Sequence, residues 1–558
     1  MGAVMVAAAD QSKNHDSGIF APLTHAVFRN MWLSNTVSNT GGLIQTVAAA
    51  WIMTSISTAD HVALVQTATF LPMALFALPA GAIADIYDRR KVQLLFFFLS
   101  LVAAALMTIV SLLGLITPWI LLGLCFLVGS GSALSAPARG ASIAEQVPKG
   151  LLSQAVALNN ISFNLARSLG PAIGGLIVLA FGATAAFAIN AISFIPMLES
   201  LRRWKREPEV SRLPPERLVR SINSGLRYVL NMQPVRRAMG RAFIFCLLAA
   251  ALPSLMPLIA RDLLVGNAGT FGLLLGAFGV GAVCGIFVLH PMRAKIGNEN
   301  TLRLCCLIIA GSLLGLAYSR SVILDLLLLM LAGIGWMIST TAISVLVQLL
   351  VPRWVTGRAI ASCSASFTLG VAIGSWLWGL VAKDYGLVLA LEGAAAGLIL
   401  SLLLGYFLPV ADRAESTELD EQLADDPDVK LGISGRSGPI SIELQYRIAE
   451  EQARDFYNLM RQQQQVRSRN GAYGWSISRD IADPERWLER FSCPTWHDYL
   501  RLRGRRTIEE SELHRQAVRM HIGTEPIKVS RWLNRPAGSV RWRDDAPDRG
   551  DEALHIES

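Results

Sequence analysis

Apolar residues recur in runs of about 20 between residues 26 and 408, and short polar breaks separate the runs. An α-helix needs about 20 apolar residues to cross the hydrocarbon core of a membrane. The pattern therefore predicts a polytopic membrane protein whose membrane part is all-α. The twelve predicted spans cover residues 27–54, 61–84, 92–113, 117–136, 153–180, 183–202, 241–261, 269–291, 301–318, 322–350, 358–382 and 386–408.

The twelve spans form two sets of six that resemble each other in sequence. When the chain is shifted by 204 positions without gaps, nine of the 29 residues at positions 147–175 are identical to those at 351–379. We expect residues that both copies keep, such as Gly175 and Gly379, to serve the shared fold. Two parallel six-helix repeats that rock around a site at the middle of the membrane are typical of secondary transporters.

Cations in the polar breaks gather on one side of the predicted bundle. This side holds the breaks at 89–91, 139–149, 293–303 and 353–358 and the central stretch 202–241, whereas the other side has Arg261, Arg320 and Lys383. By the positive-inside rule the cation-rich side faces the cytoplasm, which places both termini inside the plasma (inner) membrane. The formal net charge of +8 then reflects topology, and we expect contact with membrane lipid rather than nucleic acid.

Composition agrees with the membrane prediction. Apolar residues make up 52% of the chain and charged residues 16%, too few for a soluble protein of 558 residues to cover its apolar surface. The seven cysteines are scattered and have no metal-ligand spacing, so we expect no metal and no cofactor.

The break at residues 81–91 reads GAIADIYDRRK. Its Gly81, Asp85, Asp88, Arg89 and Arg90 resemble the signature turn between the second and third helices of major facilitator superfamily transporters, with Asp88 in place of the usual second glycine. The resemblance implies that Asp85 meets the positive end of the eleventh helix and latches the two halves in the state closed to the cytoplasm. We expect the arginines to face the anionic inner leaflet. The alternative is a plain positive-inside anchor.

A second motif lies in the fifth span. Gly170, Pro171, Gly174 and Gly175 resemble the helix-5 signature associated with antiporters of the same superfamily. Small residues let helices approach closely, and a proline bends a helix because it lacks the amide donor. We therefore expect these four residues to shape the helix and not to contact a substrate.

The longer string from Ala155 to Arg167 is more narrowly similar to the subgroup that contains the enterobactin exporter. The resemblance covers about residues 20–410 and implies efflux of a drug or siderophore driven by protons. We therefore expect a small-molecule exporter that works as a proton antiporter by alternating access, and not an enzyme. Two alternatives remain open: a membrane-tethered sensor or enzyme, and an importer or lipid flippase on the same scaffold.

Arg167 lies about 11 residues, or 16 Å, from either end of the fifth span. A cation at this depth costs at least about 2.5–3.5 kcal/mol on insertion scales, so it should face the bundle interior or a wet cavity. Asn160 and Asn164 precede it by seven and three positions and share its helix face. The three side chains offer a charged fork and two amides to an anionic or polar substrate. The alternative is an internal clasp that only holds helices together.

Proton coupling requires a titratable group in the transport pathway. Glu392 in the twelfth span and Asp325 in the tenth both lie toward the outer ends of their spans. Glu392 is the more embedded in sequence, so we rank it first. The alternative for Glu392 is an interfacial residue that reaches water.

The composition changes after Pro409. A small cytoplasmic α+β (ferredoxin-like) domain is predicted, with strands near 440–446, 471–479, 487–493 and 526–533 and helices near 449–466, 496–503 and 508–520. It resembles the antibiotic-biosynthesis monooxygenase-like fold fused to some exporters, which implies a homodimer through the sheets. We favour a dimerising or regulatory appendage over a cofactor-free enzyme with His497 or His514 as the base.

These patterns divide the chain into seven segments. They are an N-terminal tail (1–25), a first six-helix bundle (26–202), a basic loop (203–240), a second bundle (241–410), an acidic linker (411–435), the α+β domain (436–535) and a disordered end (536–558).

Overall fold

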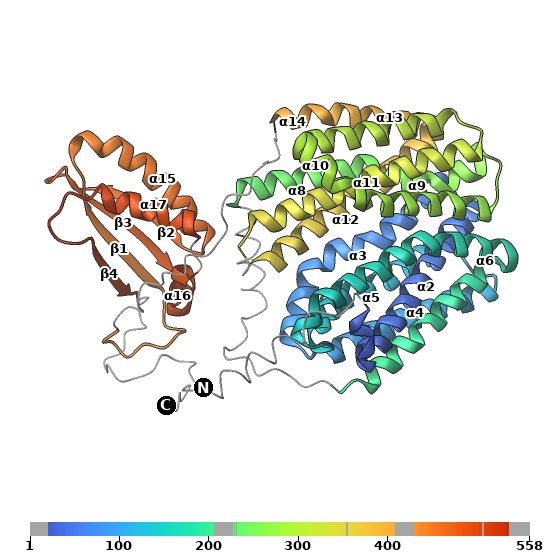
Figure 1. Cartoon of the computed structure of the whole chain (residues 1–558), viewed down its shortest axis with the longest axis horizontal. Coiled ribbons are helices and arrows are strands. Elements are labelled where there is room, and N and C mark those ends of the chain that lie inside the picture. Colours follow the sequence, from blue (N-terminus) through green and yellow to red (C-terminus); the bar gives the residue numbers. More distant parts are fainter. Residues whose placement is uncertain are drawn as a thin grey trace, which may run out of the picture. The chain divides into compact units, whose positions relative to one another are not determined.

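The computed structural model of the chain describes residues 20–205, 227, 229, 231–352, 355–407, 429–504 and 507–534. The chain divides into two compact units (Figure 1). The helical unit consists of Met1–Ile222, Arg237–Val345 and Ile360–Asp412, and the tail unit of Asn223–Arg236, Leu346–Ala359 and Arg413–Ser558.

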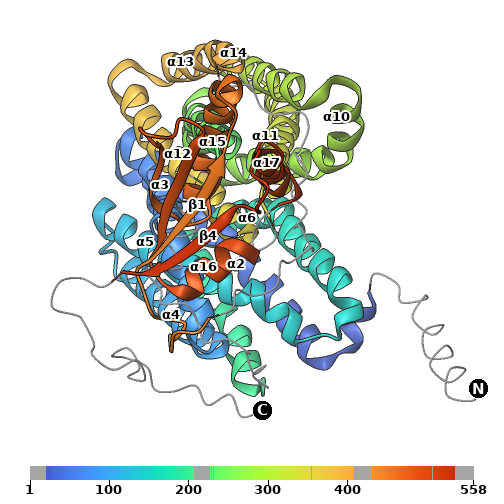
Figure 2. The same ribbon diagram turned by 90° about the vertical axis from the view of Figure 1, so that its left-hand side faces the viewer.

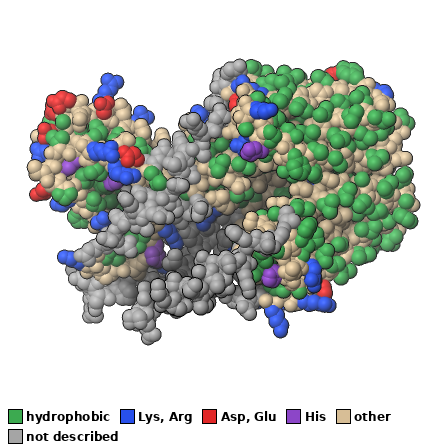
Figure 3. Space-filling view, viewed as in Figure 1, with side chains coloured by type: hydrophobic (Ala, Val, Ile, Leu, Met, Phe, Trp, Pro, Cys, Tyr) green, Lys and Arg blue, Asp and Glu red, His purple; other side chains and the backbone are tan. Residues whose placement is uncertain are grey.

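Helices build the helical unit, most of them long. They are α2 (Ala26–Ile56), α3 (Ala59–Ile86), α4 (Arg89–Leu112), α5 (Pro118–Ser142), α6 (Leu152–Arg203), α8 (Gln233–Ala249), α9 (Ala251–Leu258), α10 (Ala268–Tyr318), α11 (Val322–Leu350), α12 (Thr356–Tyr385), α13 (Leu387–Leu400) and α14 (Leu404–Phe407). Among the described residues, seven helical segments are long and apolar enough to cross a membrane. Hydrophobic side chains cover most of the visible face of this unit (Figure 3). The prediction of a multi-pass membrane protein is confirmed.

Two glycines divide the longest helices. Gly182 in α6 has φ 79° and Gly297 in α10 has φ 76°, both in the left-handed region that glycine enters without a steric penalty. The sequence predicts breaks at both places. Gly386, which lies 204 positions after Gly182, has φ 95° and begins α13. The two halves therefore turn in the same way at equivalent positions.

The same shift relates the packing of helices inside each half. A Cβ added to Gly170 of α6 would lie 3.0 Å from the Cβ of Leu43 in α2. Positions 204 residues later meet again, because a Cβ on Gly374 of α12 would lie 2.2 Å from the carbonyl oxygen of Leu247 in α8. Gly170 and Gly374 are thus equivalent sites of close helix contact, which agrees with the expectation that residues kept in both copies serve the shared fold.

The tail unit contains a four-stranded antiparallel sheet with strand order β2-β3-β1-β4. Its elements are β1 (Ile440–Arg447), α15 (Ala453–Arg469), β2 (Tyr473–Arg479), β3 (Arg486–Cys493), α16 (Trp496–Gly504), α17 (Ile508–Arg519) and β4 (Lys528–Leu533). Each lies within a few residues of its prediction. Ile440, Ile442, Leu444 and Tyr446 alternate along β1 and are buried in one core with residues of α15 and β3. The ribbons of β1, β4 and α15 are seen together in Figure 2.

An ion pair lies inside the core of the tail unit. The side chains of Arg467 and Glu489 are 1% and 0% exposed, and Arg467 Nε donates to Glu489 Oε1 over 3.1 Å. Trp475 Nε1 and Tyr446 OH donate to the two oxygens of the same carboxylate, each over 3.1 Å. Burial raises the pKa of Glu489, but the charge of Arg467 and these hydrogen bonds together lower it by more. The pKa of Glu489 therefore lies below its ordinary value.

Candidate functional site: the interface between the two helical halves

Helix α6 of the first half and helix α10 of the second half meet through glycines. A Cβ on Gly175 would lie 2.7 Å from the Cα of Gly272, and one on Gly279 would lie 2.7 Å from the carbonyl oxygen of Arg167. No side chain separates the helices at these points, so their backbones are in contact along this stretch. The predicted geometric role of Gly175 agrees with this contact.

Beyond Arg167 the two helix faces become exposed. Asn160 and Val156 precede Arg167 by seven and eleven residues and lie on its face of α6, and both are exposed. On α10, Ile286 lies seven residues after the contact glycine at 279 and is 41% exposed; His290 lies eleven after it and is also exposed. The faces that touch on one side of Arg167 are therefore uncovered on the other side.

A second pair of helices closes the two halves at the same end. Gly379 of α12, the repeat partner of the α6 contact glycine, packs against α3. Thr67 Oγ1 of α3 donates to the carbonyl oxygen of Ala372 over 2.7 Å, and Lys383 Nζ lies 3.1 Å from Asp60 Oδ2. We call this the Asp60 end of the unit, and the opposite end, where α4 begins, the Arg89 end.

Two further contacts join the halves at the Asp60 end. The guanidinium of Arg261, which follows α9, donates to the carbonyl oxygen of Thr54 in α2. Trp51 of α2 stacks on Phe271 of α10, with ring centroids 6.3 Å apart. The structure thus has the two halves closed against each other at the Asp60 end.

Arg167 lies where the closed contact ends. Its side chain is partly buried, and within the described part of the chain it forms no hydrogen bond or ion pair. Asn164 Nδ2 donates back to the carbonyl oxygen of Asn160 over 2.9 Å, so this amide is satisfied by its own helix. The three residues share one face as the sequence predicts, and Asn160 is the most exposed of them. Their role in binding stays a prediction.

Asp88 has a structural task that explains the departure from the signature turn. It is the N-cap of α4, and its Oδ1 accepts from the backbone amides of Arg90 and Lys91 over 2.8 and 3.1 Å. Its φ of −58° does not require glycine. Gly81 and Asp85 lie in the last turns of α3. The side chain of Asp85 is outside the described residues, and its latch role stays a prediction.

Both arginines of this turn bind protein groups. Arg89 donates to the carboxylate of Glu145 over 2.8 Å, and Arg90 donates to the carbonyl oxygens of Leu201 and Arg202 over 2.8 and 2.6 Å. A cation at these carbonyls offsets the negative end of the α6 dipole. The expectation that the arginines simply face lipid headgroups therefore needs correction: they join α4 to the end of α6 and to the residues after α5.

The other helix-5 residues pack against neighbouring helices. A Cβ on Gly174 would lie 3.0 Å from the Cα of Ile44 in α2, and the carbonyl oxygen of Pro171 would lie 2.7 Å from a Cβ on Gly272. These contacts agree with the expected geometric role.

The two candidate coupling carboxylates occupy different surroundings at the Asp60 end. Glu392 in α13 accepts a hydrogen bond from Tyr318 OH, and Tyr318 is 67% exposed. Asp325 in the first turn of α11 is 0% exposed; neither oxygen accepts a hydrogen bond of regular geometry from the described residues, but the hydroxyl of Ser319 and the charge of Arg320 lie close enough to act on it. The structure therefore places Asp325, ranked second, in the interior. Glu392, ranked first, lies beside an exposed tyrosine, as expected if it is an interfacial residue that reaches water.

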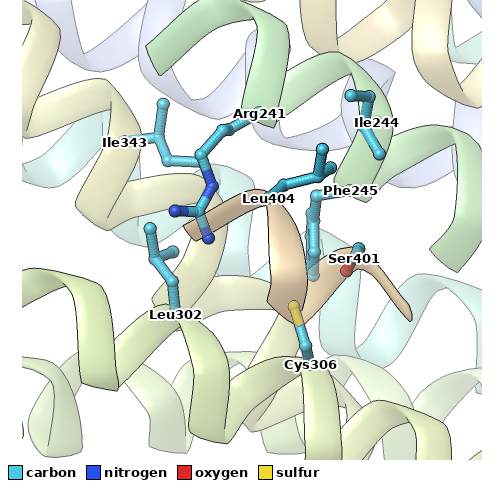
Figure 4. A pocket seen from close by; sticks show the side chains of 8 residues that line it. All are labelled: Arg241, Ile244, Phe245, Leu302, Cys306, Ile343, Ser401 and Leu404. Carbon is cyan, nitrogen blue, oxygen red and sulfur yellow. The ribbon is translucent and has the colours of Figure 1, made fainter. Parts of the chain in front are cut away.

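Arg241 was counted among the cytoplasmic cations of the stretch 202–241, at the first residue of the seventh predicted span, and the structure places it inside a half. It is 8% exposed on α8, and its Nη1 donates to both oxygens of Glu299 over 2.8 and 2.6 Å. Arg303 adds a bond of 3.1 Å to the same carboxylate. Arg241 also lines a small cavity with Cys306 and Ser401 (Figure 4). Only the four-residue spacing of Glu299 and Arg303 hinted at this cluster in the sequence.

Comparison with known proteins identifies the family. The profile of the family described as transmembrane secretion effectors (MFS_3) matches residues 17–537. The staphyloferrin A transporter of Staphylococcus aureus (strain NCTC 8325 / PS 47) is 24% identical over 375 residues, which cover 66% of this chain and 92% of that protein. The enterobactin exporter EntS of Citrobacter koseri is 27% identical over 407 residues, which cover 68% and 92%.

Solved structures show the same fold at low sequence identity. A nucleoside transporter NupG mutant has a TM-score of 0.55 and 11% identity, over 68% of this chain and 99% of that one. A bacterial homologue of the human lysosomal transporter Spinster has a TM-score of 0.54 and 13% identity, over 69% and 95%. The family and these relatives are transporters rather than enzymes. The chain belongs to the transmembrane secretion effector family of the major facilitator superfamily.

Proposed function

We propose that the chain is a secondary active transporter of the plasma (inner) membrane that exports a small molecule in exchange for protons. In this proposal α6 and α10 each contribute two spans, and the twelve spans form two six-helix bundles that rock against each other. The glycine breaks at Gly182 and Gly297 support this count. The cation-rich Arg89 end then faces the cytoplasm, with both termini on that side.

One observation carries the proposal: the halves are joined at the Asp60 end, and the continuing faces of α6 and α10 are exposed beyond Arg167. A transporter that works by alternating access needs an interface that closes at one end while the other end stays uncovered. Glycine contacts suit such an interface because two backbones can part without repacking large side chains. The observed arrangement supports a state open toward the Arg89 end.

Arg167 is the residue we assign to the substrate. A guanidinium is always charged and forms a rigid fork that matches a carboxylate or another planar anion. Because no described carboxylate lies against it, an incoming anion can satisfy it. Asn160 adds an exposed amide about two helical turns toward the open end. Relatives named for staphyloferrin A and enterobactin support a siderophore or similar metabolite as the exported molecule.

For the coupling proton we propose Asp325 ahead of Glu392. A buried carboxylate is costly unless its charge is balanced or is neutralised during part of the cycle. Asp325 has this environment, whereas Glu392 is bonded to an exposed tyrosine.

The tail is proposed as a ferredoxin-like appendage, related to the monooxygenase-like fold, that dimerises through its sheet. The order β1-α15-β2-β3-α16-α17-β4 and the strand arrangement support the ferredoxin-like assignment. On the sheet face opposite Tyr446, Glu443 binds Arg490 and Trp532, and Trp532 is 56% exposed. Light scattering on the purified chain should report a dimer that Trp532→Ser weakens; a monomer in both cases would end the dimer proposal.

Flux across a membrane tests the proposed function. Inside-out vesicles with an imposed proton gradient should accumulate staphyloferrin A or enterobactin, the two probes that the relatives suggest. Arg167→Ala should abolish uptake, because it removes the guanidinium that binds the anionic group of the substrate. Arg29→Ala, which removes an exposed cation at the start of α2, should leave uptake unchanged. Accumulation that ignores the gradient would rule out proton exchange, and full activity of Arg167→Ala would rule out the assigned site.

A further inference from the structure

A second arginine of the first half, Arg139, is half-buried in the helical unit and forms no hydrogen bond or ion pair with the described residues. The charge pattern placed Arg139 in a cytoplasmic break, but the structure places it within α5 beside a small cavity. Asn35, Gln93, Gln146 and Asn159 also line this cavity, so its wall combines one cation with four amides. The residues come from α2, α4, the segment after α5, and α6.

Among the described residues, no carboxylate balances the charge of Arg139. The side chain is half-buried at the cavity wall, and no ion pair joins it to a carboxylate of the described part of the chain. A guanidinium does not lose its proton, so it cannot escape the cost of burial by becoming neutral. The contrast with the second half is direct, because Arg241 beside the cavity there is bound to Glu299.

The amides in the wall do not replace a counter-charge. Gln93 and Gln146 both donate to Ser142 Oγ over 3.3 Å, and Asn35 Nδ2 donates to Asn159 Oδ1 over 3.4 Å. Asn35 is 7% exposed, and its Oδ1 is buried without a partner. Because Oδ1 is an acceptor, it requires a donor such as water, which marks the cavity as hydrated rather than dry; the case for an anion rests on Arg139.

We propose that this cavity binds a small inorganic anion of halide size at Arg139. About 20 Å³ is open to the centre of a water-sized molecule, which is room for about one water or one monatomic ion. Water alone would accept hydrogen bonds from the N–H groups of Arg139 but would leave its positive charge uncompensated. An anion accepts the hydrogen bonds and also compensates the charge. The size of the cavity excludes an organic anion, so this site is distinct from the one assigned to the exported molecule.

An anion bound here stabilises the fold of the first half, because helices α2, α4, α5 and α6 all border the cavity. A ligand that binds only the folded state raises its stability in proportion to the logarithm of its concentration over Kd. The effect does not require transport. It can therefore be measured whether or not the proposed function holds.

The test is thermal unfolding of the full purified chain in sodium chloride, sodium bromide and sodium gluconate at equal ionic strength. Chloride and bromide should raise the midpoint in a saturable way by about 2 °C or more relative to gluconate, which is too large to enter. Arg139→Gln should remove this difference. Arg29→Gln, the same change at an exposed cation, should keep it.

Two results would overturn the proposal. Equal midpoints of the unchanged chain in chloride and gluconate would mean that the cavity holds water only, and this comparison needs no variant. A halide effect of the same size in Arg139→Gln would place the ion elsewhere. If Arg139→Gln does not fold, Arg139→Lys can replace it, because it retains a positive charge at the site. This variant should still be stabilised by halide, but the halide concentration that gives half of the effect should differ from that of the unchanged chain.

Discussion

The contact between α6 and α10 gives a sharp prediction for Gly175→Ala. A Cβ at this position would lie 2.6 Å from the carbonyl oxygen of Ala268 and 2.7 Å from the Cα of Gly272. Both are backbone atoms of the other half, so no side chain can rotate away. The methyl group is roughly 0.8 Å too close, and the helices must move apart at the Asp60 end to admit it.

Overpacking of this kind costs about 1–3 kcal/mol. If the whole cost falls on the state closed at the Asp60 end, the population of that state drops about 5- to 150-fold relative to states in which the helices have parted. The variant should therefore melt at a lower temperature in nanodiscs. Backbone amides of Ala268–Gly279 should also exchange hydrogen faster than in the unchanged chain.

Gly311→Ala is the matched control, because it makes the same change in α10, the helix that Gly175 contacts, at a position where nothing lies within 4 Å of the added Cβ. It should be neutral or slightly stabilising, since alanine is a better helix former than glycine by about 1 kcal/mol. If Gly175→Ala melted and exchanged like Gly311→Ala, the close contact of the two halves would be refuted.

Two further predictions concern ion pairs of unequal burial. Glu489→Gln leaves Arg467 buried without a counter-charge and should destabilise the tail unit by about 3–5 kcal/mol, seen as faster hydrogen exchange in β1 and β3. Folding lowers the pKa of Glu489. The ionised carboxylate therefore stabilises the folded tail unit fully above about pH 4.3, the unfolded pKa, and this stabilisation is lost as the pH falls through the folded pKa. The Gln variant should lack this acid sensitivity. Lys383→Met removes the lysine partner of Asp60, but the Lys383 side chain is 44% exposed. The stability of the helical unit should therefore fall by at most about 1 kcal/mol, and the difference should vanish at high salt. A fall of several kcal/mol would contradict the prediction that this ion pair is weak.

Sequence patterns predicted the elements well because their signals are local. Apolar runs of span length place the helices, alternation along β1 places its strand, and the 204-residue shift anticipates the equivalent turns at Gly182 and Gly386. Glycine periodicity likewise marks the helix contacts, since only a residue without a Cβ allows two backbones to touch.

The partners of charged side chains could not be predicted in the same way. Arg139 and Arg241 look like loop cations, because the sequence shows where apolar runs stop and not where a helix continues into a packed half. Glu392 looks more embedded than Asp325 for the same reason, although tertiary packing buries Asp325 and leaves Glu392 beside an exposed tyrosine. Burial of a single charge depends on neighbours far away in the chain, and one sequence does not contain them.

The central claim is that the two halves open at one end as they close at the other. Spin labels at Val156 and Phe287 report on the Arg89 end, and labels at Phe181 and Val265 report on the Asp60 end; all four side chains are exposed. Pulsed dipolar distances should change in opposite directions when the exported molecule or a proton gradient shifts the equilibrium: the first pair should come closer while the second pair separates. Distances that stay fixed, or that lengthen at both ends together, would contradict the account.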